Sequence, residues 1–168
     1  MDKVVTTYQR GRMMKKVQTY DRMYAQALDI ISRMKLSPEP STEGSSMYVF
    51  TYKNTTMFLD EGLEDHDIDL LCPIYLSGTE EEQKQLFESA KDMAEEDLVD
   101  FDIFYIGEGL AYMSLFLQVK ETRHKLYKKH LVAMLDKLFD GYITFMCAIS
   151  LIQYTQSPEF ISSIADNK

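Results

Sequence analysis

The sequence predicts an α+β fold: a five-stranded antiparallel sheet, elements in the order α-βββ-α-ββ-α, and helices covering the sheet. Five short apolar runs between residues 46 and 119 show the period of two that is typical of strands. Three longer stretches repeat apolar residues every three or four positions, as amphipathic helices do. The length of 168 residues is typical of one domain. We therefore expect a single domain over residues 1–168, with an ordered core of about 15–154 and flexible ends.

The first predicted helix runs from Lys15 to Lys35 and carries one apolar stripe. Pro38 disfavours helical geometry at Ser37, so this helix should end near Leu36. The Pro- and Ser-rich segment that follows, up to residue 45, is predicted to be a loop.

Three strands follow, over residues 47–53, 56–60 and 68–76. The pair Asn54 and Thr55 is predicted to form a tight turn between the first two. Pro73 has no amide proton for the ladder, so the third strand should be an edge strand or carry a bulge there.

The second helix begins with a capping box, formed by Thr79 and Glu82, and its apolar stripe extends to Leu98. Strands at 101–106 and 111–119 then form a second hairpin, whose glycines permit positive φ.

The last predicted helix spans residues 122–152, and its second half is apolar on all sides. Gly141, near its middle, indicates a kink or a close contact. Residues after Gln156 are predicted to be loose, with Phe160 and Ile161 folding back.

Alternation along the strands gives two apolar faces. The first collects Met47, Val49, Met57, Leu59, Ile68, Leu70, Cys72, Met113, Leu115 and Leu117. The second is more aromatic and collects Tyr48, Phe50, Tyr52, Phe58, Leu71, Tyr75, Phe104, Ile106, Tyr112 and Phe116. Soluble monomers rarely expose so much apolar surface, so we expect a helix, a second subunit or a client to cover the second face.

The second face supplies the candidate partner-binding residues. They are its aromatic members: Tyr48, Phe50, Tyr52, Phe58, Tyr75, Phe104, Tyr112 and Phe116. Because the eleven methionines fall mostly on buried stripes, we expect core packing to explain most of them.

Composition narrows the class of protein. A net charge of −9 and a pI near 4.8 disfavour nucleic acids and anionic membranes as partners. The polar start of the chain does not resemble a secretory signal, and the longest apolar run is too short to span a membrane. We expect a soluble, cytoplasmic protein. Cys72 and Cys147 lie in apolar runs, which favours core packing for both.

No catalytic, cofactor or metal motif is predicted. The clustered oxygens of Asp60, Glu61, Glu64, Asp65, Asp67 and Asp69 could ligate Ca²⁺, but a solvated turn is the expected reading. Asp97, Asp100 and Asp102 could be paired carboxylates for acid–base catalysis, but they bracket a helix-to-strand junction, where polar turn residues are expected. His66, His124 and His130 are spaced unlike ligands of one metal.

Two stretches carry a family resemblance. They are residues 57–75, where a strand ends in an acidic turn and the next closes on Pro73 and an aromatic, and residues 88–105, where a helix enters the second hairpin. With the element order, they resemble the fold shared by type III secretion chaperones and the YbjN-like family. The resemblance covers about residues 15–150. It implies a non-enzymatic, often dimeric protein that binds another polypeptide, and it transfers no functional residues.

Together these observations predict a non-enzymatic protein-binding module, chaperone-like or regulatory, that acts as a homodimer without a cofactor. The alternative is a regulatory protein that binds a small apolar or aromatic ligand in a pocket lined by Tyr48, Tyr52 and Tyr112. An enzyme without a recognisable motif is the third reading. The sequence names neither the client nor its pathway.

Overall fold

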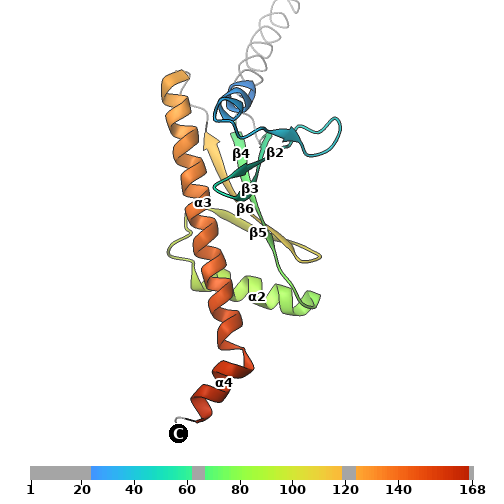
Figure 1. Ribbon diagram of the computed structural model, residues 1–168, viewed down its shortest axis with the longest axis vertical. Coiled ribbons are helices and arrows are strands. Elements are labelled where there is room, and N and C mark those ends of the chain that lie inside the picture. The colour runs from blue at the N-terminus through green and yellow to red at the C-terminus, as the bar shows by residue number, and fades with distance from the viewer. Residues whose placement is uncertain (1–23, 62–66, 119–123, 167–168) are drawn as a thin grey trace, which may run out of the picture.

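The computed structural model of the protein describes residues 24–61, 67–118 and 124–166. These residues form an antiparallel sheet with helices packed against it, which confirms the predicted α+β class (Figure 1). The sheet has the strand order β1-β2-β3-β4-β6-β5. The strands are β1 (Glu39–Pro40), β2 (Tyr48–Tyr52), β3 (Thr55–Glu61), β4 (Asp67–Tyr75), β5 (Asp102–Gly107) and β6 (Leu110–Gln118).

The sheet therefore has six strands in the described chain, one more than predicted. The additional strand β1 lies in the segment predicted to be a loop and pairs with β2, Glu39 opposite Val49. Just beyond it, the Ser41 amide donates to the Met47 carbonyl at 2.8 Å. Pro40 is tolerated because β1 is the outermost strand.

The first hairpin turns one residue earlier than predicted. Tyr52 pairs with Thr55, and the two turn residues, Lys53 and Asn54, have φ values of 48° and 62°. Positive φ at both positions is typical of the two-residue type I′ turn, which matches the twist of the strands.

This turn corrects the predicted faces. Directly opposite residues of a hairpin project to the same side, and Phe50 lies opposite Met57. Even-numbered residues of β2 therefore share a face with odd-numbered residues of β3. Tyr48, Phe50 and Tyr52 consequently lie on the side of Met57, whereas the prediction placed them on the other side.

β4 lies between β3 and β6, so it is not the edge strand that the prediction offered. It has no bulge at Pro73 either, because its register with β6 is regular there. Its pairing with β3 ends at Phe58 and Leu71, whereas the regular register with β6 continues through Pro73. Pro73 thus sits where β4 has a partner on one side, a local edge that explains why a residue without an amide proton is accepted.

The helices are α2 (Glu80–Met93), α3 (His124–Thr155) and α4 (Pro158–Ala165), and residues 24–33 are also helical. The predicted capping box of α2 is confirmed, since Thr79 Oγ1 accepts from the Glu82 amide at 3.3 Å and Glu82 Oε2 accepts from the Thr79 amide at 2.7 Å. Gly78, which has a φ of 111°, precedes it.

These helices, α4 excepted, pack on one face of the sheet. Phe87 of α2 contacts Tyr105 of β5 and Phe145 of α3, with ring centroids 5.8 and 5.9 Å apart. Ile30 and Ile31 are buried in the same core. Seven strand residues of this covered face are fully buried: Met57, Leu59, Leu70, Cys72, Ile74, Ala111 and Met113.

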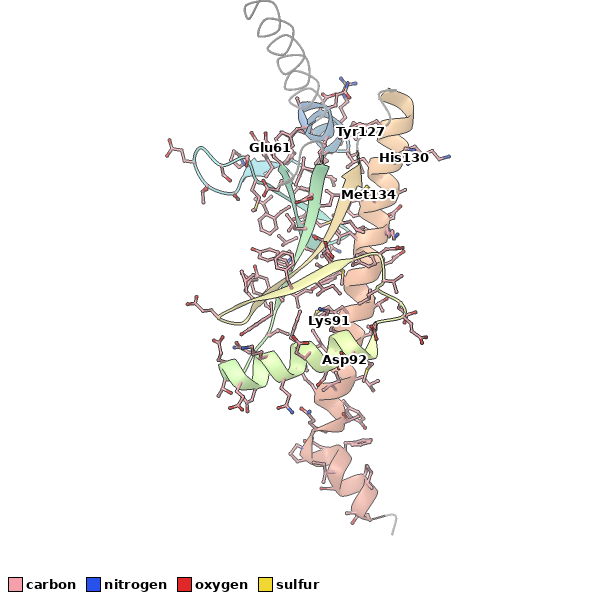
Figure 2. All side chains as sticks on the ribbon, turned by 180° about the vertical axis from the view of Figure 1, so that it is seen from behind. Glu61, Lys91, Asp92, Tyr127, His130 and Met134 are labelled. Carbon is pink, nitrogen blue, oxygen red and sulfur yellow. The ribbon has the colours of Figure 1, made fainter. Side chains whose placement is uncertain are left out.

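α3 is the long helix across this covered face, and Figure 2 shows Tyr127, His130 and Met134 along its first half. Tyr52 donates to Asp136 Oδ1 at 2.7 Å, and Lys53 pairs with the same oxygen at 2.7 Å. These two bonds tie the first hairpin to α3. Gly141 makes the predicted close contact, because a Cβ there would lie 2.4 Å from the Phe101 ring.

Residues 150–165 form a helical C-terminal arm, which Figure 1 shows extending away from the sheet to α4. The tail after Gln156, for which no helix is predicted, thus contains α4, and Ser157 caps this helix by accepting from the Phe160 amide at 3.3 Å. Phe160 packs on Tyr154, with ring centroids 5.3 Å apart. The arm exposes Leu151, Tyr154, Ile161 and Ile164.

The two cysteines lie in opposite environments. Cys72 is fully buried, and this burial raises the pKa of its thiol to about 12. Cys147 is exposed on α3, so the prediction of core packing holds for Cys72 and is wrong for Cys147. The reason is that α3 continues past the sheet, where its far side meets solvent although its sequence is apolar.

Candidate binding face

The side of the sheet opposite the helices is the candidate site, and we call it the open face. None of the helices in the described ranges lies over it. It consists of Met47, which directly precedes β2, and the outward strand residues Val49, Thr51, Thr56, Phe58, Asp60, Asp69, Leu71, Pro73, Tyr75, Asp102, Phe104, Ile106, Leu110, Tyr112 and Ser114.

Aromatic rings form the centre of the open face. Tyr112 of β6 contacts Phe104 of β5 on one side and Phe58 of β3 on the other, with ring centroids 5.9 and 6.2 Å apart. Phe104 is 41% exposed, and Tyr75 and Ile106 near it are 73% and 56% exposed. A large apolar surface bare in a single chain is typical of an interaction site.

The second hairpin positions two of these rings. Gly107, Glu108 and Gly109 have φ values of 101°, 53° and 76°, and a Cβ on Gly109 would lie 2.5 Å from the Leu76 carbonyl oxygen. Glycine is thus required at position 109 both by conformation and by space. The turn brings Phe104 opposite Tyr112 in the ladder.

Three aspartates flank the aromatic centre. Asp60 of β3 lies directly opposite Asp69 of β4, and Asp102 of β5 lies opposite Ser114 of β6. Like charges directly opposite each other destabilise a sheet. The Asp60–Asp69 pair is therefore expected to lower the stability of the folded protein. The open face as defined above includes no lysine, arginine or histidine.

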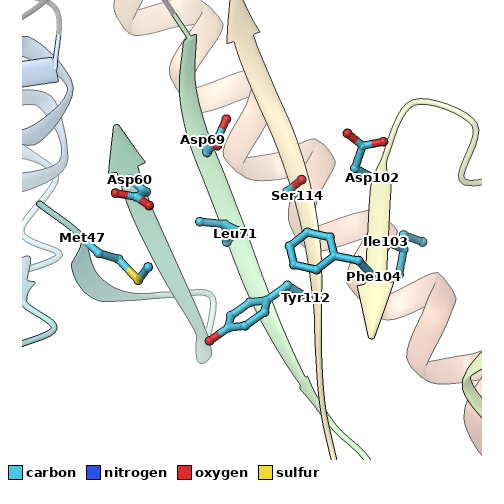
Figure 3. Close-up of a pocket in the computed structure, with 9 residues that line it drawn as sticks. All are labelled: Met47, Asp60, Asp69, Leu71, Asp102, Ile103, Phe104, Tyr112 and Ser114. Carbon is cyan, nitrogen blue, oxygen red and sulfur yellow. The ribbon is translucent and has the colours of Figure 1, made fainter. Parts of the chain in front are cut away.

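A hollow of about 480 Å³ lies on this face, with Met47 and Leu71 among its lining residues. Figure 3 shows Asp60, Asp69 and Asp102 toward one end of the hollow and Tyr112 toward the other. Burial, and secondarily the negative charge of the ionised Tyr75 side chain, raises the pKa of Tyr112. The hollow therefore offers an apolar floor with carboxylates at one end.

The structure brings together half of the predicted partner-binding residues. Phe58, Tyr75, Phe104 and Tyr112 share the open face, and Phe116 lies in β6 with its side chain outside the described residues.

The other three belong to the covered face, because the hairpin turn reverses their side. Tyr48 packs on Tyr24 with ring centroids 6.4 Å apart, Phe50 is buried, and Tyr52 bonds Asp136. Tyr48, Tyr52 and Tyr112 therefore do not line one pocket, and the ligand site predicted from them is not formed.

Sequence reasoning missed Asp60, Asp69 and Asp102 as parts of this face. Asp60 and Asp69 fall within the predicted strands 56–60 and 68–76, where the structure confirms them, but the expected reading of their carboxylates is a solvated turn. The sequence does contain a signal for two of them, because alternate residues of a strand point to the same face. Asp69 alternates with Leu71 in β4, and Asp102 alternates with Phe104 in β5.

The other candidate residues form no site in the described chain. No three His, Cys, Asp or Glu residues within it are grouped to hold a metal ion. Asp100 pairs with Lys137 at 2.6 Å, and His130 is exposed on α3. His66, Glu64, Asp65 and the side chains of Asp67 and His124 lie outside the described residues.

A separate finding concerns membranes. Among the described helices, even the 32-residue α3 lacks a segment apolar enough to cross a bilayer.

Comparison with known proteins supports the fold alone. The sequence matches no protein-family model and no curated protein. Its structure is similar to the crystal structure of an uncharacterized protein from Methanothermobacter thermautotrophicus, with a TM-score of 0.52 and 13% sequence identity. The similarity covers 76% of this chain and 96% of that chain.

Proposed function

We propose that this protein is a non-enzymatic module that binds another polypeptide through its open face. The observation that carries the proposal is the ring cluster of Phe58, Phe104 and Tyr112 on a sheet face that no described helix covers. Phe104 is exposed, and Phe58 and Tyr112 are half-buried. Of the occupants expected from the sequence, a helix of the described chain is ruled out, and a client or a second subunit remains. A cytoplasmic location and the chaperone-like role belong to this proposal.

The chemistry of the face defines the client. Aromatic anchors in a partly enclosed hollow are typical hot spots of protein interfaces. The aspartates at its end favour a segment that combines apolar side chains with lysine or arginine, because opposite charges at an interface select partners and register. An acidic or phosphorylated client is disfavoured by the same residues.

A selection of peptides displayed on phage tests the proposal. The full-length protein is the bait, and Tyr112→Ala with Phe104→Ala is the counter-bait. We expect enriched peptides to be apolar and basic and to bind the double variant at least about 30-fold more weakly, because aromatic hot spots contribute about 2 kcal/mol or more.

Leu151→Ala on the C-terminal arm is the control, since it removes an exposed apolar residue far from the open face. Peptides that bind the wild type and the double variant equally would contradict the proposal. Unfolding curves of each bait verify that the variants are folded.

The homodimer is part of the same proposal, and the C-terminal arm supports it. Its exposed side chains, Leu151, Tyr154, Ile161 and Ile164, form an apolar surface separate from the open face. Sedimentation at micromolar concentration should show a dimer that Ile161→Glu with Ile164→Glu converts to a monomer. A wild-type chain that sediments as a monomer would remove the dimer from the proposal.

A small ligand remains the second candidate, favoured by the hollow of about 480 Å³, which is within the usual range for ligand sites. A compound that raises the melting temperature of the wild type, but not that of the Tyr112→Ala variant, would support it.

A further inference from the structure

We propose that the open face is occupied, until a client arrives, by the N-terminal segment of the same chain, residues 1–23. The inference rests on the proposed function in one respect, namely that the open face is a binding surface. It goes beyond the proposed function by naming an occupant of that surface. Because this occupant competes with the client, it regulates client binding from within the molecule.

Charge complementarity is the first argument. Residues 1–23 contain six lysines and arginines and two aspartates, so their net charge is +4. Because the whole chain carries −9, the remaining residues carry −13. The open face contributes Asp60, Asp69 and Asp102 to that excess and includes no basic residue among the positions that define it.

The composition of the segment is the second argument. Its basic residues alternate with apolar ones, such as Tyr8, Met13, Met14 and Val17. Methionine side chains are flexible and adapt to aromatic surfaces, which suits a face built around Tyr112. The segment thus has the apolar and basic character that the hollow favours.

The position at which the described chain begins is the third argument. Tyr24, the first described residue, donates from its hydroxyl to the carbonyl oxygen of Ser46. Ser46 in turn donates to Asp60 Oδ1 at 3.2 Å, and the next residue, Met47, lines the hollow. Tyr24 also packs on Tyr48 of the covered face, so the segment joins the body of the protein at the sheet edge near Ser46 and reaches the open face by passing around that edge.

Length is sufficient. Six strands spaced by about 4.8 Å make a sheet about 25 Å wide, and 23 residues span about 35 Å even when fully helical. The segment can cross the face from the Met47 rim to β5 in either a helical or an extended form.

Thiol labelling in the full-length chain tests the inference. The background variant is Cys147→Ser, which leaves Cys72 fully buried. Met47→Cys places a reporter at the rim of the hollow, and Glu88→Cys places a control on the exposed side of α2. Reaction with a neutral maleimide is followed by mass spectrometry.

The decisive variant reverses four charges of the segment: Arg10→Glu, Arg12→Glu, Lys15→Glu and Lys16→Glu. Labelling requires an uncovered face, so a segment bound about 90% of the time slows it about tenfold. We expect the charge reversal to increase the labelling rate at position 47 about tenfold. The labelling rate at position 88 should change less than about twofold.

A matched control reverses four exposed lysines elsewhere, Lys84, Lys91, Lys128 and Lys129, and changes the net charge equally. We expect no acceleration from it. The direction is diagnostic, because added negative charge near a thiol raises its pKa and slows labelling. Acceleration therefore has to come from uncovering the face.

A bis-maleimide crosslink between Met14→Cys and Met47→Cys identifies the donor chain in a mixture of isotopically labelled and unlabelled protein. Crosslinks within one chain support the proposal. Crosslinks only between copies, or a labelling rate at position 47 that the segment reversal does not change, overturn it. The phage selection above depends on Tyr112 and not on residues 10–16, so the two proposals fail separately.

Discussion

The two faces of the sheet are built from the same strands, and both are apolar, yet they lie in different environments. The covered face carries side chains such as Leu70 and Ile74, which are fully buried under α2 and α3. The open face carries aromatic rings up to 73% exposed, together with three carboxylates. Apolar alternation thus marks the strands, whereas the placement of charge marks which face no described helix covers.

The largest expected difference between the two environments is in thiol reactivity. With its pKa raised from 9.0 to about 12, Cys72 has about a thousandfold less thiolate than an unperturbed thiol at neutral pH, before steric protection is counted. We expect a maleimide to modify one thiol in the native protein, Cys147, and two after denaturation. Rapid native modification of Cys72 would show that the covered face is open in solution.

The next largest effect compares Leu70 and Leu71, neighbours in β4 that point to opposite faces. Leu70 is fully buried, so Leu70→Ala should lower the free energy of unfolding by about 2–5 kcal/mol. Leu71 is half-buried on the open face, and Leu71→Ala should cost about 1 kcal/mol or less. Urea unfolding measures both. Equal losses would mean that the open face is as buried as the core.

Gly141→Ala probes how closely α3 is packed. A Cβ at this position would meet the Phe101 ring at 2.4 Å, so the substitution should cost roughly 1–3 kcal/mol although alanine is the better helix former. Phe101→Ala in the same chain removes the obstacle, and the double variant should lose less than the sum of the single losses. Strict additivity in urea unfolding would contradict the close contact.

The smallest effect concerns the attachment of the first hairpin to α3. The ammonium of Lys53 and the hydroxyl of Tyr52 lower the pKa of the Asp136 carboxyl. Asp136 therefore adds stability that is present above its unfolded pKa, near 3.8, and is lost as the pH falls through the lower folded value. Because Lys53 and Asp136 are both 45% exposed, the gain should not exceed about 1 kcal/mol.

Tyr52→Phe measures this attachment. Its loss of unfolding free energy at pH 7 should shrink as Asp136 becomes protonated, since a neutral carboxyl is a weaker acceptor.

Burial, followed by its bond to Asp136, raises the pKa of Tyr52 to about 12. The stability linked to Tyr52 is thus complete below pH 10 and is lost between about pH 10 and 12. A difference titration at 295 nm against the variant should show one phenol near pH 12, and one near pH 10 would contradict the contact.

Much of the fold could be predicted because its signals are local. Thr79 and Glu82 are three residues apart and form a capping box by themselves, and Gly109 marks a turn that only glycine fits. β1 could not be predicted, since Glu39 and Pro40 join the sheet through backbone bonds that leave no pattern in the side chains.

The candidate site was predicted only in part, for two physical reasons. The first is register: across a two-residue turn, an even-numbered residue lies opposite an odd-numbered one, so Phe50 shares the covered face with Met57, whereas the prediction grouped residues of equal parity across the turn. The second is strand order: β6 lies between β4 and β5, and this arrangement brings Asp102 of β5 and Asp69 of β4 to the same hollow. Neither contact has a signature within a short window of sequence.

The pairing of Asp60 with Asp69 also bears on how an aromatic sheet stays in solution. If two copies met through their open faces, three carboxylates from each would be forced together away from water, at a high electrostatic cost. We therefore expect the aspartates to disfavour the stacking of two open faces, much as charges protect exposed sheet edges from aggregation. Replacing these aspartates with uncharged residues should make the protein self-associate through its open face.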